Sequence, residues 1–315
     1  MNIIVHGSLA FDRIKNFPGY FRDNILPDRI HNLSVSFYIE SVEEKRGGTG
    51  GNIVYNLALL GERPKILASV GREAVSYIEF LKERNVDVSL LNFNEDAMNS
   101  MCDIITDKAN NQITAFFVGA SGIPTNVDFT KLDRENTIVS LSPANNKADS
   151  LKYGKMCKEL GITHIFDPGQ MTPEYSKEEL LMMIDGSALF TVNDYELELV
   201  KAKTGLTADE IAQRTDALVI TLGAKGSAIK TRSNTFKIHG FMQDKMVDPT
   251  GAGDAYRAGL LKGLTLGLSL EDTGRLAACA ASFAIEHHGT QEHAYTHDQF
   301  CERYKQYFDQ ECPLS

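Results

Sequence analysis

A carboxylate, Asp254, directly follows three small residues where a loop is expected to become a helix. The stretch VDPTGAGDAYRAGLL spans 247–261 and contains Gly251, Ala252 and Gly253. Small residues at a helix start can expose successive backbone N–H groups, which together bind an oxyanion. A carboxylate beside such a site can take the proton of an attacking hydroxyl, as phosphoryl transfer requires. The alternative is a plain helix-terminal charge, which contributes a few tenths of a kcal/mol to about one.

A second glycine cluster precedes an apolar helix. Gly47, Gly48, Gly50 and Gly51 lie at the start of RGGTGGNIVYNLALLG, residues 46–61. Glycine lets the backbone approach a ligand closely, and a helix N-terminus favours polar or anionic groups. The spacing matches neither the dinucleotide fingerprint GxGxxG nor the phosphate loop GxxxxGK[ST]. A flexible turn leading into a helix is the alternative interpretation.

A third candidate pairs an amide with a carboxylate. Asn193 and Glu196 are three residues apart in TVNDYELELV, where a strand gives way to a helix. This spacing is typical of a capping box, in which the two side chains only satisfy the helix N-terminus. In the functional interpretation, both groups face the site and organise a hydrated Mg²⁺ and phosphates.

Short apolar strands alternate along the chain with amphipathic helices, and this order positions all three motifs. Such alternation predicts a mainly parallel sheet with helices on both faces. The predicted strands are 3–5, 64–71, 136–143, 163–169, 188–193 and 217–223, and the predicted helices are 74–86, 151–161 and 178–185.

Two stretches break this alternation. Residues 34–41, SVSFYIES, alternate like a half-exposed strand, and 100–119 reads as a hairpin with its turn at 108–111. They are expected to pair into a small antiparallel sheet that covers a substrate, the alternative being a sheet without function. The predicted division is a lid, residues 11–46 and 99–118, and a core, residues 1–10, 47–98 and 119–315.

Composition and charge limit the class of protein. Of 315 residues, 43% are hydrophobic and 23% charged, which indicates a globular chain with a sizeable core. The net charge of −10 argues against nucleic acid and anionic membranes as main partners. It does not argue against a cofactor that carries phosphate, because backbone N–H groups and a metal can hold one. The apolar runs are too short for a membrane span, and the N-terminus does not resemble a signal peptide.

The cysteines indicate a reducing compartment. There are five, they lie far apart, and none forms a CxxC pair. We therefore expect reduced thiols in a cytoplasmic protein. The last residues, 309–315, are expected to be a frayed end.

Taken together, the motifs resemble the ribokinase-type (PfkB) carbohydrate kinase family. The stretch DPTGAGDAYRAGLL is similar to its C-terminal signature, GGTGGN to its N-terminal glycine motif, NDYE to its Asn-x-x-Glu motif, and TLGAKG to its nucleotide-lining turn. The resemblance runs from residue 1 to about 295 in the expected order. It implies a ribokinase-like α/β fold, a three-layer sandwich with a mainly parallel central sheet and a small β-sheet lid. Within the family, GSLAFDRI, ILPDRIHNLSVSF, NNQITAFFVGA and FDPGQ look most like bacterial adenosine and nucleoside kinases.

The resemblance also implies roles for individual residues. Asp254 would be the catalytic base beside an anion hole, and Asn193 and Glu196 would organise Mg²⁺ and phosphates. The substrate's sugar hydroxyls would be held by Asp12 and Asn52, with the backbone of Gly47 and Gly48 close by. ATP would be contacted by Thr221, Gly223 and Gly226. A monovalent cation such as K⁺ would lie near Asp248, Thr250, Ala284, His287 and Gly289, where His287 is bulkier than the residue often found there.

A purine needs a flat apolar slot beside the sugar pocket, and the two lid stretches supply aromatic rings for it. Phe37 and Phe116 are the candidates. Because Phe116 and Phe117 must point to opposite faces of a strand, only one can meet the ligand. The resemblance favours Phe116, and Gln112 lies on the same face and could bond a base edge. Alternatively, these rings only fill the junction between lid and core.

We therefore expect an ATP- and Mg²⁺-dependent kinase acting on the 5′-hydroxyl of a purine nucleoside, with adenosine favoured, as a monomer or homodimer. A kinase for a free sugar such as ribose or fructose is the alternative. A non-catalytic nucleoside- or sugar-binding protein is another, against which Asp254 and the anion hole argue. A nicotinamide-dependent dehydrogenase is disfavoured because VHGSLAFDR has a single glycine after the first strand.

Overall fold

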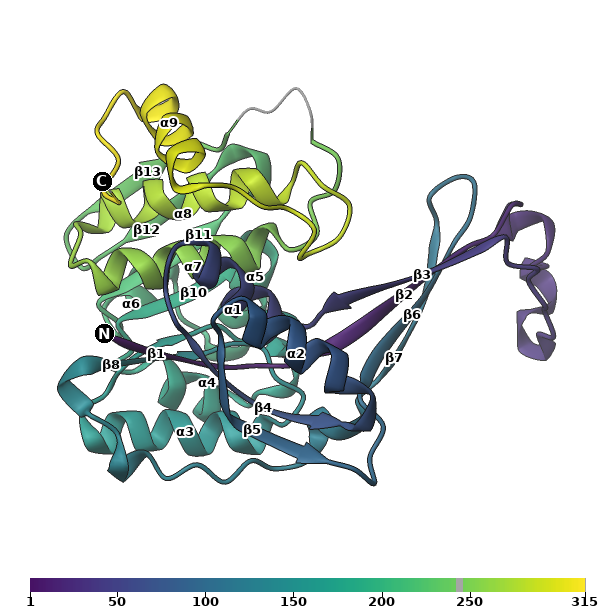
Figure 1. The fold of residues 1–315 in the computed structure, drawn as a ribbon, viewed down its shortest axis with the longest axis horizontal. Helices are drawn as coiled ribbons and strands as arrows, with labels where there is room; N and C mark the ends of the chain where they lie inside the picture. Colours follow the sequence, from purple (N-terminus) through teal and green to yellow (C-terminus); the bar gives the residue numbers. More distant parts are fainter. Residues whose placement is uncertain (242–245, 315) are drawn as a thin grey trace.

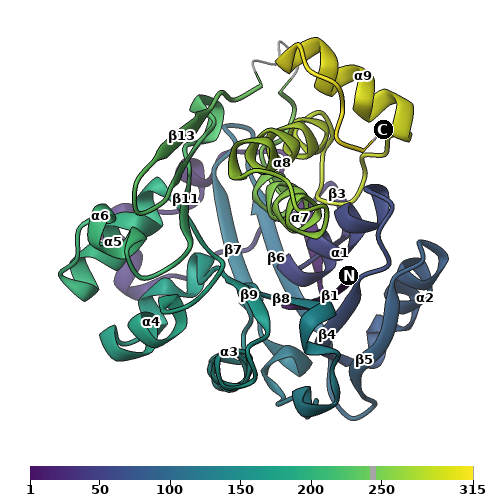
Figure 2. The ribbon, with the colours of Figure 1, turned by 90° about the vertical axis from the view of Figure 1, so that its left-hand side faces the viewer.

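The molecule has three layers: a large sheet between two sets of helices (Figure 2). A computed structural model describes residues 1–241 and 246–314. Within these residues the central sheet has nine strands in the order β13-β12-β11-β10-β9-β8-β1-β4-β5. The strands are β1 (Asn2–His6), β4 (Lys65–Gly71), β5 (Asp87–Asn94), β8 (Thr137–Leu141), β9 (Thr163–Phe166), β10 (Leu189–Asn193), β11 (Ala217–Thr221), β12 (Ser227–Lys230) and β13 (Thr235–Ile238).

The pairing along this sheet is parallel from β5 to β11, and only β12 and β13 join it antiparallel. The prediction of a mainly parallel sheet is therefore confirmed. Parallel strands are buried on both faces, which explains their nearly continuous apolar sequences. In β1, Ile3 and Val5 pack on one side and Ile4 on the other, because successive side chains of a strand point to opposite faces.

Helices cover both faces of the sheet, as the alternation predicts. One set packs with Ile3 and Val5, and the other packs with Ile4. The first set is α1 (Thr49–Leu59), α2 (Val75–Glu83), α7 (Ala252–Thr265), α8 (Leu270–Ala284) and α9 (His297–Phe308). The second set is α3 (Lys147–Leu160), α4 (Lys177–Ile184), α5 (Asp194–Thr204) and α6 (Ala208–Ala212).

A small second sheet projects from the core (Figure 1). Its order is β3-β2-β6-β7. The strands are β2 (Ala10–Asn16), β3 (Ser41–Gly47), β6 (Ser100–Thr106) and β7 (Gln112–Phe117). The β6–β7 hairpin is the one predicted. The sheet is mixed, however, because β2 pairs with β6 in parallel whereas the other two pairs are antiparallel.

The strand predicted over 34–41 is wrong, because β3 starts only at Ser41. The reason lies in an aromatic cluster. Phe37 packs against Phe17 and Phe21, with ring centroids 4.9 Å and 5.1 Å apart. Phe37 is therefore partly covered by this cluster rather than by a sheet.

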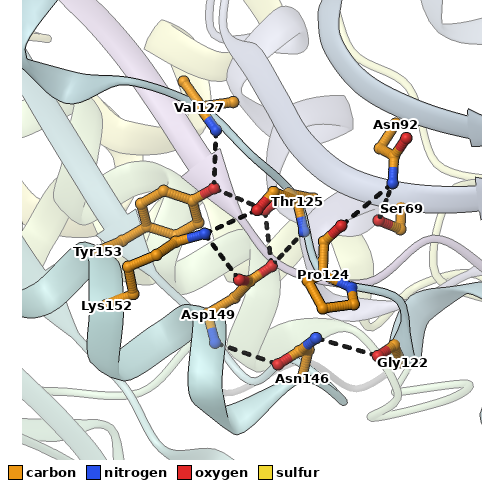
Figure 3. A network of polar contacts seen from close by, with 10 residues as sticks. All are labelled: Ser69, Asn92, Gly122, Pro124, Thr125, Val127, Asn146, Asp149, Lys152 and Tyr153. Atoms are coloured by element: carbon orange, nitrogen blue, oxygen red, sulfur yellow. Dashed lines mark hydrogen bonds and ion pairs between the residues drawn. The ribbon is translucent and has the colours of Figure 1, made fainter.

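A polar network holds the chain against the core where it returns from the small sheet (Figure 3). The Asp149 carboxylate on α3 accepts hydrogen bonds from Thr125 N at 2.6 Å and Thr125 Oγ1 at 2.7 Å. Tyr153 Oη lies 2.7 Å from the same hydroxyl, and Lys152 Nζ donates to Thr125 O at 2.7 Å. This network fixes the segment between β7 and β8 against α3.

The C-terminal residues are held rather than frayed. Cys301 and Cys312 form a disulfide, and Cys312 is buried. His297 Nε2 lies 2.9 Å from Leu314 O. The prediction of reduced thiols is therefore wrong for this pair, and the expected frayed end is wrong for the described residues up to 314. Free thiols remain at Cys102, Cys157 and Cys279. Among the described residues, no helix is both long and apolar enough to cross a membrane.

Candidate active site

The candidate motifs converge because of the sheet topology. Strands β1, β8, β9, β10 and β11 are adjacent and parallel, so the loops that leave their carboxyl ends meet at one edge of the sheet. Asn193 ends β10 and pairs in register with Thr221, which ends β11. Asp167 follows the last residue of β9. The motif that contains Asn193 and the motif that contains Thr221 are distant in the sequence but thus lie side by side.

The Gly251–Gly253 segment forms the N-terminus of α7. Gly251 is the residue before the helix and has a φ of 82°, a left-handed conformation that glycine adopts at little cost. A Cβ at Gly251 would also lie 3.0 Å from Thr290 Cγ2. Ala252 begins the helix, and Gly253 is exposed. The segment therefore presents the positive end of a helix dipole on an accessible backbone, which suits a phosphate group.

Asp254 is buried, and each of its two oxygens has a partner. Asn52 Nδ2 on α1 donates to Asp254 Oδ2 at 2.7 Å, and Arg257 Nη1 donates to Asp254 Oδ1 at 2.9 Å. Burial raises the pKa of Asp254, whereas the Arg257 charge and the Asn52 hydrogen bond act in the opposite direction. The carboxylate is thus fixed in place next to the glycine segment.

Arg257 also pairs with a second carboxylate. Its Nε donates to Oδ2 of Asp167, whose side chain is 1% exposed. These carboxylates raise the pKa of Arg257 although burial opposes this. Among the described residues, Asp167 Oδ1 has no hydrogen-bond partner. Arg257 therefore bridges two buried acids that belong to different elements.

Asp12 of β2 lies at the same place from the side of the small sheet. A Cβ at Gly47 would overlap the Asp12 carboxylate, so the glycine makes room for it. Burial, followed by the charge of Asp254, raises the pKa of Asp12 to about 6. The two carboxylates therefore lie close enough to repel each other, and a polar ligand between them would meet both.

A chain of buried hydrogen bonds orients the Asn52 amide. Gln291 Nε2 donates to Asn52 Oδ1 at 2.8 Å, which leaves the Asn52 amino group to face Asp254. Gln291 Nε2 also donates to Tyr77 Oη, and Tyr77 Oη donates to Gly47 O at 2.9 Å. The next residue, Gly48, has a φ of 86° and precedes α1. Tyr77 of α2 and Gln291 of the loop after α8 thus hold the glycine motif in place through these hydrogen bonds.

Asn193 and Glu196 form a capping box. Glu196 N donates to Asn193 Oδ1 at 2.7 Å, and Asn193 N donates to Glu196 Oε2 at 2.8 Å. The capping interpretation therefore describes both side chains in this structure. Burial and the charge of Asp167 raise the pKa of Glu196. Such crowding of like charges favours a cation nearby, so the residues fit a hydrated Mg²⁺, whose binding here stays a prediction.

The turn after β11 contains Thr221, Gly223 and Gly226. Gly223 has a φ of 58° and is exposed. Gly226 has a φ of 89°, and a Cβ there would overlap Ile238 O. The glycines are thus required by the turn itself, and their contact with ATP stays a prediction.

The residues predicted around a monovalent cation lie on two segments joined by Asp248. Its carboxylate accepts from Thr250 N at 2.9 Å and from Gly289 N at 3.1 Å. Ala284, at the end of α8, is buried, and His287 Nδ1 lies 3.5 Å from Phe283 O. The structure therefore brings the two segments together beside Gly251, and cation binding stays a prediction.

One face of the small sheet carries the predicted substrate residues. In the strand register, Asp12 aligns with Cys102 and Cys102 with Phe116, so these three share a face. Gln112 is on that face too, but it aligns with the residues four positions further along, toward the far end of the sheet. Phe37 belongs to the aromatic cluster at that end, which favours packing as its role.

Comparison with known proteins identifies the family. The model of the pfkB family carbohydrate kinases matches residues 20–297. The chain belongs to this family.

Similar proteins include a nucleoside kinase of Methanocaldococcus jannaschii, 34% identical over 272 residues, or 86% of this chain and 89% of that protein. The crystal structure of the M. jannaschii nucleoside kinase superposes with a TM-score of 0.85 at 33% identity, covering 97% of this chain and 99% of the other. A Burkholderia thailandensis nucleoside kinase in complex with inosine superposes with a TM-score of 0.83 at 32% identity, covering 98% and 99%. The predicted ribokinase-like fold is confirmed.

This pfkB-family kinase is accordingly a phosphotransferase with an alcohol group as acceptor. Three residues of the candidate site were not predicted from the sequence, and two of them, Arg257 and Asp167, left a signal there. Arg257 lies three residues after Asp254, which places both on one face of a helix. Asp167 directly follows a parallel strand, and Gln291 lies in a polar loop after α8 whose position the sequence does not indicate.

Proposed function

We propose that this kinase transfers the γ-phosphoryl group of ATP to the 5′-hydroxyl of a purine nucleoside, with adenosine used best. Its similarity to nucleoside kinases over nearly the whole chain supports a nucleoside acceptor. Asp12 on the small sheet suits ribose hydroxyls, since a carboxylate accepts hydrogen bonds from two adjacent hydroxyls. Phe116 on the same face suits a flat base.

The observation that carries this proposal is the placement of Asp254. It directly follows the Gly251–Gly253 segment, and Arg257 and Asn52 hold its two oxygens. As general base, Asp254 accepts the proton of the acceptor hydroxyl while that oxygen bonds to phosphorus and the bond to the ADP oxygen breaks. The backbone at the start of α7 stabilises the negative charge of the transferred group.

The remaining motifs supply sites for the nucleotide and for cations. Thr221, Gly223 and Gly226 would contact ATP, and Glu196 with Asn193 would hold a hydrated Mg²⁺ beside the phosphates. Mg²⁺ neutralises phosphate charge when bound. K⁺ would be held near Asp248 and Gly289 by the residues of the two joined segments.

The direct test is a substrate panel. ADP release would be followed with ATP and adenosine, guanosine, inosine, cytidine, ribose or fructose, for the parent and for Asp254→Asn. We expect adenosine to give the highest kcat/KM. Removing a general base costs about 10²–10⁴-fold, so Asp254→Asn should lower kcat at least a hundredfold.

A matched control separates chemistry from charge. Asp298→Asn removes an exposed aspartate on α9 and should leave kcat unchanged. Circular dichroism would show that both variants are folded. Near-normal turnover by Asp254→Asn would exclude the base assignment, and a parent enzyme that prefers ribose or fructose would exclude the nucleoside assignment.

A further inference from the structure

The site contains a largely buried arginine, Arg257, to which the reaction as proposed assigns no role. We propose that Arg257 is a positioning residue, which holds the Asp254 carboxylate in place and in its ionised form through a bridge to Asp167. The proposal rests on Asp254 as the general base. It assigns Arg257 no contact with the acceptor.

The geometry of Arg257 fits this role. On α7, it lies three residues after Asp254, so the helix itself sets their relative position. Nη1 donates to Asp254 at 2.9 Å, while Nε donates to Asp167. The side chain of Arg257 is 15% exposed and those of Asp254 and Asp167 are 12% and 1% exposed. Asp167, which follows β9, thus holds the guanidinium at Nε, while Asp254 is bonded to Nη1.

Only an arginine side chain makes this bridge easily. A guanidinium presents several donors in one rigid plane and can bond two acids at once, whereas an ammonium acts as a single point charge. Arg257 Nη1 also lies 3.1 Å from the position that a Cβ on Gly253 would occupy. The guanidinium therefore packs against Gly253 while it bonds Asp254, the next residue in the chain.

The charges around Asp254 show why an ionised base needs this partner. The titratable groups that face Asp254 and Arg257 are Asp12 of β2, Tyr77 of α2, Asp167 after β9 and Glu196 of α5. None of these four groups is a cation, and Arg257 is the cation that favours the ionised form of Asp254. Without it, burial and the charge of Asp167 would both favour protonated Asp254, which cannot accept a proton.

Two other roles would explain an arginine at this position. It could serve only to attach α7 to the end of β9, or it could bind the transferred phosphoryl group directly. A structural role predicts a loss of stability with an unchanged pH profile. A phosphoryl contact predicts a loss of rate that is independent of pH and that persists when Asp254 is replaced.

The experiment measures kcat and nucleoside KM from about pH 5 to about pH 9 for the parent, Arg257→Met, Arg257→Lys, Asp254→Asn and the double variant Asp254→Asn/Arg257→Met. An opposite charge at this distance lowers a carboxyl pKa by about one to three units. In Arg257→Met, the acid limb of the kcat–pH profile, where kcat falls as the pH is lowered, should therefore lie about one to three pH units higher than in the parent. At high pH, kcat should recover. Arg257→Lys keeps the charge and should keep the limb near that of the parent.

The double variant decides whether Arg257 acts through Asp254. We expect Arg257→Met to lower kcat at neutral pH at least tenfold in the parent, and less than about threefold in the Asp254→Asn background, because residues that act as a unit are not additive. Nucleoside KM should change less than about threefold. Equal losses in both backgrounds, or an acid limb that stays in place, would overturn the proposal.

Asp167 would be left without its partner in Arg257→Met, so folding is controlled separately. Circular dichroism and thermal melting accompany each variant, and Arg257→Met/Asp167→Leu removes both buried charges if the single variant does not fold. The acid limb of the kcat–pH profile of this double variant should still lie at higher pH than that of the parent. An acid limb at the same pH as in the parent would also refute the proposal. Normal turnover by Asp254→Asn would instead refute the assignment of Asp254 as general base, on which this proposal rests.

Discussion

Phe116 provides a quantitative test of whether a nucleobase binds against the small sheet. It shares a face with Asp12 and is 48% exposed. A phenylalanine presents about 200 Å² in total, so about 100 Å² of Phe116 remains for a ligand to cover. Covering half to all of that area contributes about 1–2.5 kcal/mol at 25 cal/mol per Å². Base–aromatic stacking measured by alanine substitution gives a similar range, about 1–3 kcal/mol.

The corresponding change in affinity is about five- to seventyfold, because 1.4 kcal/mol is a factor of ten. Phe116→Ala should therefore raise the KM for adenosine by that factor and leave kcat nearly unchanged. Turnover of free ribose, which has no base, should not change. Steady-state ADP release with adenosine and with ribose measures both effects in one preparation.

The neighbouring residue is a matched control. Phe117 is 47% exposed and points to the opposite face of the same strand. Phe117→Ala removes the same ring from nearly the same exposure and should leave the adenosine KM within about twofold of the parent. The reasoning fails if the two variants raise the adenosine KM equally, or if Phe116→Ala impairs ribose and adenosine to the same extent.

Two further predictions follow from the carboxylates of the site. Glu196→Gln retains a side chain that can complete the capping box, so the melting temperature should hold while the Mg²⁺ concentration for half-maximal rate rises at least severalfold. As a control, Glu210→Gln changes the equivalent position of the α6 capping box and should alter neither the melting temperature nor the Mg²⁺ requirement. An unchanged Mg²⁺ requirement in Glu196→Gln would leave capping as the only role of Glu196. Asp12 is ionised above its pKa of about 6, so the nucleoside KM should rise as pH falls below about 6, and this rise should disappear in Asp12→Asn. A nucleoside KM that is flat from about pH 5 to pH 8 in the parent would contradict the role of Asp12.

The sequence predicted those features that depend on near neighbours. Gly251 to Asp254 are consecutive, so the small residues, the helix start and the carboxylate are all visible in one stretch. The parallel sheet was predictable for a similar reason, since each buried strand carries its own apolar run. Asn193 and Glu196 were recognised as a capping pair because both partners lie within one helical turn.

The small sheet shows where such local patterns stop being sufficient. Alternation predicted a strand over 34–41, but the strand begins only at Ser41, and Phe37 packs in an aromatic cluster instead. The strand that carries Asp12, β2, reads AFDRIKN and was not predicted as a strand. Ala10 and Phe11 are buried and residues 12–15 are half-buried, because β3 and β6 flank this strand. This environment cannot be read from the residues of β2 alone.

The charge state of Asp254 is the property that the sequence could least reveal, because it is set by residues from four separate segments. Asn52 comes from α1, Arg257 from α7, Asp167 from the end of β9, and Asp12 from β2. Burial favours the protonated acid, whereas Arg257 and Asn52 favour the carboxylate. Burial also makes a carboxylate a stronger base, so a buried aspartate suits the reaction only if a cation keeps it ionised. The placement of Arg257 one helical turn after Asp254 meets that requirement with a single residue, and the anchor that makes it effective, Asp167, lies 90 residues away in the chain.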